Sequence, residues 1–209
     1  MRSVSSTTDG RAERGEATKR RILDAARDVL IERGYAGTST RVVAERAGTQ
    51  LSLVHYHFGG KQQLLGAVLE RQNADLLERQ RAHYAAPGPL SEKWRVACGF
   101  LDEDIGSGYV RALWELWAAG LAEPELAERW RVAMGGWRDL LTEVFADWAA
   151  GLERAPPLSP RVLASLATNI FQGIEIELVA GVTDEESPHR EGLAYLGELI
   201  ERAEQAGGQ

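Results

Sequence analysis

Glycines and prolines divide this chain into segments whose apolar residues recur at helical spacing, and this pattern constrains the fold most strongly. The first apolar stripe ends at Gly34, a candidate helix C-cap, and consists of Ile22, Leu23, Ala26, Val29 and Leu30. No segment alternates apolar and polar residues as a half-buried strand does, and no internal repeat is visible. The sequence therefore predicts an all-α fold of about nine helices.

The same punctuation sets the expected helix boundaries. Residues 1–15 are rich in Ser, Thr, Gly and Arg, which predicts a disordered arm ahead of the first helix. A long helix from Lys61 to about Tyr84 is closed by Pro87-Gly88-Pro89. The other expected helices start at Ala17, span about 40–47 and 51–58, start at Ser91, span 109–119, start at Pro124, and span about 161–180 and 190–205. The candidate N-caps are Thr38 or Ser39, Ser91, Ser159 and Ser187.

Composition narrows the class of protein. Of the 209 residues 44% are apolar and 26% are charged, values that suit a soluble chain with a buried core. The single cysteine, Cys98, excludes an internal disulfide framework and a cysteine-based zinc cluster. No stretch reaches the roughly 18 uninterrupted apolar residues of a membrane helix, and the first twenty residues lack an apolar signal segment. We expect a cytoplasmic protein with no membrane partner.

Charge is distributed unevenly along the chain. The net charge is −7, but residues 1–66 hold eleven Lys and Arg against seven acids and so carry +4, which leaves −11 for the remainder. A basic N-terminal third on an acidic body is expected where one end faces an anionic partner. Chance variation accounts for the same asymmetry equally well.

Two short helices joined through Gly48-Thr49-Gln50 have the size and turn chemistry of a helix-turn-helix. Ala44 and Ala47 are small enough for a close approach of the helices, and Gly48 permits a sharp turn. The expected small core is Val43, Val54 and Phe58. The side chains left to form hydrogen bonds are Gln50, Ser52, His55 and Tyr56.

The run from Ile22 through Leu69 resembles the DNA-binding domain of TetR-type (tetracycline-repressor-like) transcriptional regulators. The matching segments are ILDAA (22–26), ERGYAGTSTRVVAERAG (32–48) and LVHYHFGGKQQLL (53–65). The resemblance implies a DNA-binding domain over about 16–62, with the helix-turn-helix at about 39–58, and a regulatory, ligand-binding and dimerisation domain over 63–209. It also implies a homodimer on a palindromic double-stranded DNA operator.

Carried over position by position, the resemblance assigns DNA contacts to both short helices. Backbone or base-edge contacts from the first fall to Thr38, Thr40 and Arg41. Groove-facing positions of the second are Gln50, Leu51, Ser52, Leu53 and His55, and the expected phosphate contacts are Tyr56, His57 and Lys61. Leu51 and Leu53 depart from the family's polar pattern, since aliphatic side chains reach thymine methyls but make no bidentate base contact. The operator sequence is therefore not transferable.

The two histidines and the basic residues ahead of the domain have other possible roles. His55 and His57 point about 200° apart on a helix, so we predict no metal site, and no motif calls for a cofactor. The basic residues ahead of the domain either form a solvated face or contact the DNA backbone or minor groove; these are Arg11, Arg14, Lys19 and Arg20.

All six tryptophans lie beyond residue 90, in the acidic part of the chain. At helical spacing such a stripe is either core packing or the wall of a ligand pocket between helices. Candidates for an effector pocket are Trp114, Trp117, Trp130, Met134, Trp137, Phe171 and Glu177. Gly135-Gly136 in the same segment predicts a kink or a close helix approach.

The helix expected over 161–180 has two faces without charge. One is a broad apolar arc predicted to pack on its own subunit; the other, predicted to contact a second subunit, holds Ser165, Asn169, Gly173, Ile176 and Ala180. A helix central to a monomer has the same pattern. Glu177 falls inside the apolar arc, where it pairs with an arginine such as Arg111 or Arg138, lies exposed near the helix end, or anchors a cationic or hydrogen-bonding effector.

The sequence thus predicts a dimeric, ligand-responsive regulator, in the first place a repressor. An unknown small-molecule effector would move the helix 61–84 and change the separation of two reading heads, which must match half-sites about 34–36 Å apart. An all-α enzyme is the alternative from another class, but no nucleophile–base pair, paired-carboxylate motif or phosphate loop is present in the sequence. A helical protein-interaction module without DNA binding is the third possibility.

Overall fold

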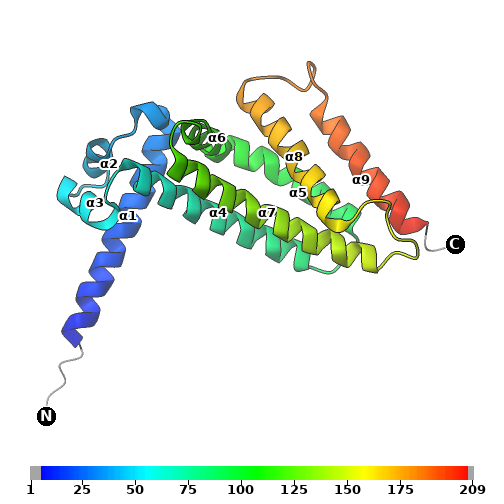
Figure 1. The fold of residues 1–209 in the computed structure, drawn as a ribbon, viewed down its shortest axis with the longest axis horizontal. Coiled ribbons are helices and arrows are strands. Elements are labelled where there is room, and N and C mark those ends of the chain that lie inside the picture. Colours follow the sequence, from blue (N-terminus) through cyan, green and yellow to red (C-terminus); the bar gives the residue numbers. More distant parts are fainter. Residues whose placement is uncertain (1–5, 207–209) are drawn as a thin grey trace, which may run out of the picture. The chain divides into compact units, whose positions relative to one another are not determined.

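The computed structural model describes residues 6–206, and within that range it consists of nine α-helices and no strand (Figure 1). Their bounds are α1 Ser6–Gly37, α2 Thr40–Arg46, α3 Leu51–Phe58, α4 Lys61–Ala85, α5 Leu90–Gly106, α6 Tyr109–Gly120, α7 Pro124–Ala150, α8 Pro160–Val179 and α9 His189–Gln205. The all-α prediction and the helix count are confirmed, and most expected helix ends are correct to within one or two residues.

The chain divides into two compact units, each described here by itself. The head unit contains the chain up to Arg71 together with Glu115–Arg129, and the body unit contains Gln72–Trp114 with Trp130–Gln209. Three helices, α4, α6 and α7, contribute residues to both units.

Helix α1 begins earlier than expected, because residues 6–15 continue it toward the N-terminus instead of forming a disordered arm. The stretch contains the good helix formers Ala12, Glu13 and Arg14 and no proline, and the Arg14 side chain donates to the Gly10 carbonyl at 2.7 Å. Residues 1–5 of the expected arm lie outside the described residues. At its other end the helical geometry breaks at Gly34, whose φ is +69°.

The head core is built by α1, α2, α3 and the start of α4. Val43 and Val54 are completely buried and Phe58 nearly so, which confirms the small core expected of the helix-turn-helix. They pack against the buried stripe of α1, which includes Ile22 and Val29. α2 and α3 are each too short to be stable alone, so the apolar core that they share with α1 and α4 holds them in place.

In the body unit, α5 contacts both α8 and α9 (Figure 1). Trp94 of α5 is buried, and its indole N–H donates to the Leu193 carbonyl of α9 at 2.8 Å. The N-cap prediction for Ser91 is wrong: Ser91 lies inside α5, and the Glu204 carboxylate accepts from the Leu90 amide at 2.7 Å and from the Ser91 hydroxyl at 2.6 Å. A side chain distant in sequence performs the capping that a local serine was expected to perform.

Helices α7, α8 and α9 test the sequence predictions of a kink or close approach at Gly135-Gly136 and of two serine N-caps. α7 runs without a break through Gly135-Gly136, and a Cβ on Gly136 would lie 3.0 Å from Leu77 Cδ1, so the glycine serves a close approach of α7 to α4. Ser159 caps α8 as expected, accepting from the Val162 amide, whereas α9 has no side-chain cap bond and Ser187 does not cap it. α8 is long and apolar enough, by length and composition, to cross a bilayer, with 22% of that stretch buried.

Candidate functional site

The turn between α2 and α3 follows directly from three local residues. Ser39 precedes α2 in extended geometry, and its hydroxyl accepts from the Val42 amide at 3.3 Å, which settles the Thr38-or-Ser39 alternative. Gly48 has a φ of +59°, which lets the chain reverse between the helices. Gln50 precedes α3 without a side-chain cap bond. The turn therefore closes while the Gln50 amide group stays available.

One face of α3 is open to solvent. Ser52 and His55 are exposed, Tyr56 is 82% exposed, and Leu51 and Leu53 are about two-fifths exposed. Opposite them, Val54 and Phe58 are buried in the head core. The helix presents hydroxyl, imidazole, phenol and two aliphatic groups on a fixed frame, a combination that suits hydrogen bonds to base edges and contacts with thymine methyls.

The predicted DNA contacts that come before α3 in the chain differ in their exposure to solvent. Arg41 is exposed and bonded only loosely to Glu45, at 3.3 Å, and Thr40 is half-buried. Thr38, in contrast, is 2% exposed, and its hydroxyl donates to the Gly34 carbonyl at 2.7 Å. Its inclusion among the DNA contacts is corrected accordingly, because the local hydrogen bond turns the side chain inward.

Lys61 and the α3 histidines have partners inside the protein. The Lys61 ammonium donates to the Tyr35 carbonyl at 2.7 Å and lies 3.9 Å from the centroid of the Tyr35 ring. His55 Nδ1 lies 2.9 Å from the Gly59 carbonyl, at the end of α3, and His57 contacts the Tyr56 ring edge-on. Among the described residues no group of three or more potential ligands gathers as a metal site.

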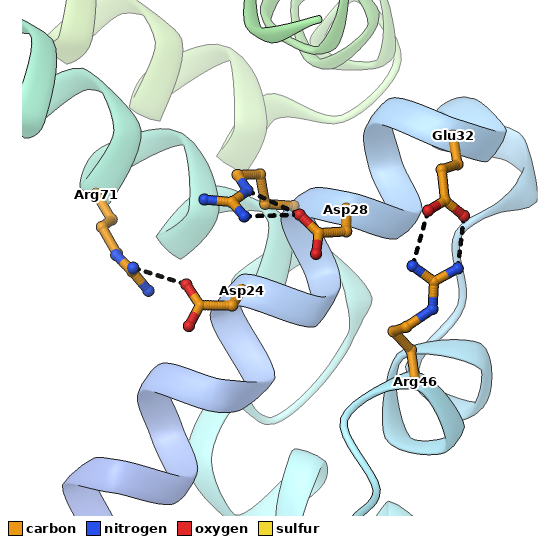
Figure 2. Close-up of polar contacts among 6 residues, drawn as sticks. Asp24, Asp28, Glu32, Arg46 and Arg71 are labelled. Atoms are coloured by element: carbon orange, nitrogen blue, oxygen red, sulfur yellow. Dashed lines mark hydrogen bonds and ion pairs between the residues drawn. The ribbon is translucent and has the colours of Figure 1, made fainter. Parts of the chain in front are cut away.

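Ion pairs fasten α2 and α4 to α1, as Figure 2 shows. Arg46, in the last turn of α2, forms a two-pronged contact with Glu32 at 2.8 and 2.5 Å, and Arg71 of α4 donates to Asp24 at 2.7 Å. The hydrogen bond from Arg46 lowers the pKa of the exposed Glu32 carboxyl. The two-pronged geometry fixes the orientation of α2 as well as its distance from α1.

The break at Gly34 is matched by two carboxylates of the same unit. The Tyr35 amide, freed by the break, donates to Glu115, and the Tyr35 hydroxyl donates to Glu123 at 2.5 Å. Burial, with the hydrogen bond to Glu123, raises the pKa of Tyr35 to about 12. Gly34 has a φ of +69°, which other residues rarely adopt, and a Cβ there would lie 2.5 Å from a Glu115 carboxylate oxygen, so a larger residue would be strained and would displace that carboxylate.

The body unit contains an interior cavity of about 100 Å³, lined by α4 through α8. Three predicted pocket residues line it: Met134, Trp137 and Phe171. Glu175 also lines the cavity, and the Trp114 side chain interacts with its carboxyl, whereas Trp117 and Trp130 are not part of the wall. Trp130 instead contacts the Trp114 ring, with centroids 6.4 Å apart.

Glu175 is the cavity residue that the sequence did not single out. Burial raises the pKa of its carboxyl to about 7, in spite of the interaction with Trp114, and the charge of Asp104 adds to the increase. Glu177, the predicted anchor, points elsewhere: its side chain is 48% exposed and lies 3.2 Å from His189 Nε2. Of the alternatives left open for Glu177, exposure near the helix end is what the structure shows.

The outward face of α8 is broader than expected. Of the five residues predicted on it, Asn169, Gly173, Ile176 and Ala180 are exposed and Ser165 is half-buried. Leu166 and Ile170, assigned by periodicity to the inner arc, are exposed as well, at 47% and 37%. Packing of α8 on α5 rotates it so that Ala164 and Ala167 face inward.

Comparison with known proteins agrees with this geometry. Residues 22–68 match the family profile described as "Bacterial regulatory proteins, tetR family". An uncharacterised HTH-type transcriptional regulator of Mycobacterium tuberculosis is 29% identical over 192 residues, which cover 90% of this chain and 95% of that protein.

Two solved structures share the fold. A TetR-family transcriptional regulator of a Rhodococcus species superimposes with a TM-score of 0.73 at 23% identity, over 88% of this chain and 98% of that one. The transcriptional regulator FadR of Bacillus subtilis, in complex with stearoyl-CoA, gives 0.66 at 17% identity, over 87% and 94%. The two structures share only the fold; the matched profile and the mycobacterial regulator are what make this chain a member of the TetR family of bacterial helix-turn-helix DNA-binding transcriptional regulators, a family of regulators and not of enzymes.

Proposed function

We propose that this regulator is a cytoplasmic homodimeric repressor that leaves a palindromic operator when a small-molecule effector enters the body cavity. The observation that carries the proposal is the pairing of an open polar face on α3 with an interior cavity between α4 and α8. Helix α4 contributes Lys61–Arg71 to the head and its remaining residues to the body, so one helix is common to both sites.

The base-reading residues we propose are those that α3 leaves exposed. They are Gln50, Leu51, Ser52, Leu53 and His55. The phosphate contacts we propose are Tyr56, His57 and Lys61, and α2 contributes Thr40 and Arg41. Arg41 is the best placed cation, because its side chain is 81% exposed and its bond to Glu45 is long. A cation of this kind binds phosphate without regard to sequence.

The dimer contact we propose is formed by the outer faces of α8 and α9. Leu166, Ile170, Tyr195 and Leu199 expose apolar or aromatic surface there. A groove of about 1060 Å³ between these helices is lined largely by apolar side chains. A second copy of the chain is the occupant, because a palindromic operator requires two heads related by twofold symmetry and an isologous contact supplies that symmetry.

The effector cavity as it stands admits only a small molecule. Its volume of about 100 Å³ is below the range of about 300–1,000 Å³ usual for drug-sized ligands. The stearoyl-CoA of the Bacillus subtilis FadR complex is therefore not transferred to this chain. Ligand binding acts on DNA affinity only through its difference in affinity between the two head arrangements.

Selection from a pool of random duplex DNA tests the operator claim. The purified protein is expected to retain sequences sharing a palindrome, with half-sites about 34–36 Å apart. Arg41→Ala is expected to weaken retention across all sequences and to lower the salt dependence, whereas Arg161→Ala, at an exposed arginine of α8, leaves both unchanged. Retention without any shared sequence, or none at all, would favour a helical interaction module instead.

Two further measurements test the dimer and the direction of regulation. Leu166→Asp is expected to shift the sedimentation of the protein toward the monomer, while Val132→Asp, at an exposed apolar position of α7, is not. A reporter carrying the recovered operator over its promoter is expected to fall in expression when the protein is present. A rise in expression would identify an activator.

A further inference from the structure

The charged residues that line the body cavity are all acidic. Its charged wall residues are two carboxylates, Asp104 and Glu175, and no Lys, Arg or His side chain lines it. Aromatic and aliphatic groups form most of the remaining wall, among them Phe100, Trp137 and Phe171. A cavity with this lining attracts cations and repels anions, and the low dielectric of the interior strengthens both effects.

The two carboxylates differ in how they are balanced. Asp104 accepts a hydrogen bond from Arg79 at 2.6 Å, and Arg79 also lies 3.8 Å from Glu103 and stacks on the Phe100 ring. The arginine behind the wall is thus already engaged. The neutral side chain of Trp114 opposes the rise in the pKa of Glu175, and no cation of the described residues contributes to that pKa. Its negative charge is therefore the one that a ligand can still neutralise.

Three hydrogen-bond donors of the wall are engaged, while two other polar groups of the wall have no partner in the described part of the chain. The Trp137 indole donates to Asn73 at 2.8 Å, the Thr168 hydroxyl to the Ala164 carbonyl at 2.8 Å, and the Gln172 amide to Met134 Sδ at 3.1 Å. In contrast, the Gln80 side-chain carbonyl and the Tyr109 hydroxyl are buried with no partner among the described residues. A buried polar atom without a partner is costly, and Gln80 and Tyr109 both line the cavity that Glu175 lines.

The Tyr109 hydroxyl lies in the field of both carboxylates. Burial and the charges of Glu175 and Asp104 raise its pKa above the usual range, so the phenol stays neutral and can accept a hydrogen bond. Tyr84, the other phenol of the wall, is likewise kept neutral by burial. The group that this wall lacks is a positively charged donor of several N–H bonds.

We propose that the cavity binds a small ligand carrying a protonated amine, with Glu175 as its counter-charge and Gln80 and Tyr109 as further hydrogen-bond acceptors. An ammonium group donates three hydrogen bonds and accepts none, which matches one carboxylate and two free acceptors. The role of that amine as the effector rests on the function proposed above, whereas its binding does not.

Size limits the ligand further. A dry cavity of about 150 Å³ accommodates benzene, so a cavity of about 100 Å³ holds fewer non-hydrogen atoms than the six of benzene unless its walls move. Short alkylamines meet both the size and the charge requirement. We therefore choose n-butylamine as the probe, with butan-1-ol and butyrate as neutral and anionic counterparts of similar size.

The first experiment is calorimetry on the full-length wild-type protein with the three probes at pH 8. The amine is expected to bind at least tenfold more tightly than the alcohol, and butyrate most weakly. The amine affinity is also expected to rise about tenfold between pH 6 and pH 8, because the carboxyl of Glu175, with a pKa of about 7, must ionise to act as counter-charge. The other acid of the wall, Asp104, is paired with Arg79; burial raises the pKa of its carboxyl, and the contact with Arg79 opposes that increase.

Two variants test whether the Glu175 carboxylate is responsible for amine binding and its pH dependence. Glu175→Gln keeps size and one acceptor, and it is expected to bring the amine to the affinity of the alcohol and to remove the pH dependence. Glu177→Gln, two residues along α8 at an exposed carboxylate, is expected to change neither. Should Glu175→Gln fail to fold, the wild-type pH series still decides, since only ionisation of a wall carboxylate between pH 6 and 8 produces that rise.

Several results would overturn the inference. They are equal binding of amine and alcohol, preferred binding of butyrate, absence of binding by all three probes, and amine binding that survives Glu175→Gln. None of these touches the proposed repressor function, which stands or falls with recovery of an operator and its release by any ligand. Conversely, amine binding that leaves operator affinity unchanged supports the site and contradicts the amine's role as effector.

Discussion

The head and the body of this regulator use their acidic side chains in opposite ways. In the head, Glu32 lies at the surface in a two-pronged pair with Arg46, which lowers the pKa of the carboxyl. In the body, Glu175 lies against an interior cavity, where burial raises its pKa to about 7. The carboxylate of Glu32 is paired and holds α2 in place, whereas that of Glu175 has no cationic partner among the described residues.

The same contrast extends to the neutral polar groups. Thr38 is buried in the head, but its hydroxyl donates to the Gly34 carbonyl. Gln80 is buried in the body, and its side-chain carbonyl has no partner among the described residues. A reading head must hold its side chains in one geometry, whereas a ligand site must keep groups available.

The largest effect is expected from emptying the head core. Ile22 is completely buried on α1, and Ile22→Ala is expected to cost about 2–5 kcal/mol of unfolding free energy, because nothing can fill the cavity left behind. α2 and α3 depend on this core, so DNA binding should be lost with it. Urea unfolding and DNA retention measure both. Leu121→Ala, at a 75% exposed position of the head, is the control, and equal loss in the two variants would contradict the expectation.

The next effect has the opposite sign and depends on pH. The carboxyl of Glu175 keeps its proton up to about pH 7 in the folded chain but ionises near 4.5 when unfolded, so it takes away stability as the pH rises from 4.5 to 7. The shift corresponds to about 3 kcal/mol at most. Glu175→Gln should therefore stabilise the protein at pH 8 and change little at pH 4.5.

Thermal unfolding across this pH range checks that expectation. Glu177→Gln is the matched control, because its carboxylate is exposed and beside His189. A stability gain in Glu175→Gln that is the same at pH 4.5 and pH 8 would show that packing, and not the charge, changed. In that case the body cavity would be no different from the head core in its treatment of polar groups.

These two regions were also unequally predictable from sequence. The helix-turn-helix rests on local signals, such as Ser39 before α2 and Gly48 in the turn, and local signals are written in neighbouring residues. Burial of Thr38 escaped prediction, because two adjacent hydroxyl residues both suit an N-cap and only packing decides between them. The early start of α1 escaped as well, because composition alone does not distinguish a polar helix from a coil.

The body cavity depends on contacts that no local pattern contains. Five helices contribute to it, and the rotation of α8 about its axis decides which acid faces inward. Periodicity placed Glu177 in the apolar arc, whereas packing of Ala164 and Ala167 on their neighbours directs Glu175 inward. Helical spacing of large side chains correctly predicted Met134, Trp137 and Phe171 as wall residues, but the same pattern also selected Trp117 and Trp130, which do not line the cavity.

A pair of alanines compares packing in the two regions directly. Ala44 is 3% exposed in the head core and Ala97 is 7% exposed in the cavity wall. Ala44→Val should destabilise by about 1–3 kcal/mol, because a filled core must shift to admit two methyl groups. Ala97→Val has the cavity to expand into, so its cost should be smaller, and it should weaken ligand binding. Unfolding free energies of the two variants decide; a larger cost at Ala97 would show that the cavity has no room for the added groups.

The smallest effect is expected at the surface pair of Figure 2. Glu32→Gln removes one side of the contact with Arg46, and because both side chains are solvated the loss of stability should be slight and should vanish in about 1 M salt. The pKa of Glu32 is lowered in the folded chain, so the contribution is present above the unfolded pKa of 4.5 and is lost as the pH falls through the folded value.

Amide hydrogen exchange in α2 is the measurement sensitive enough for this pair. Glu45→Gln, which breaks the single longer contact to Arg41 on the same helix, is the control and should change exchange less. Faster exchange in α2 for Glu32→Gln at low salt alone would show that the pair orients the helix. Exchange unchanged at any salt would mean that the apolar core around Val43 holds α2 without help from Glu32, and then the contrast with Glu175 would not extend to the function of the head.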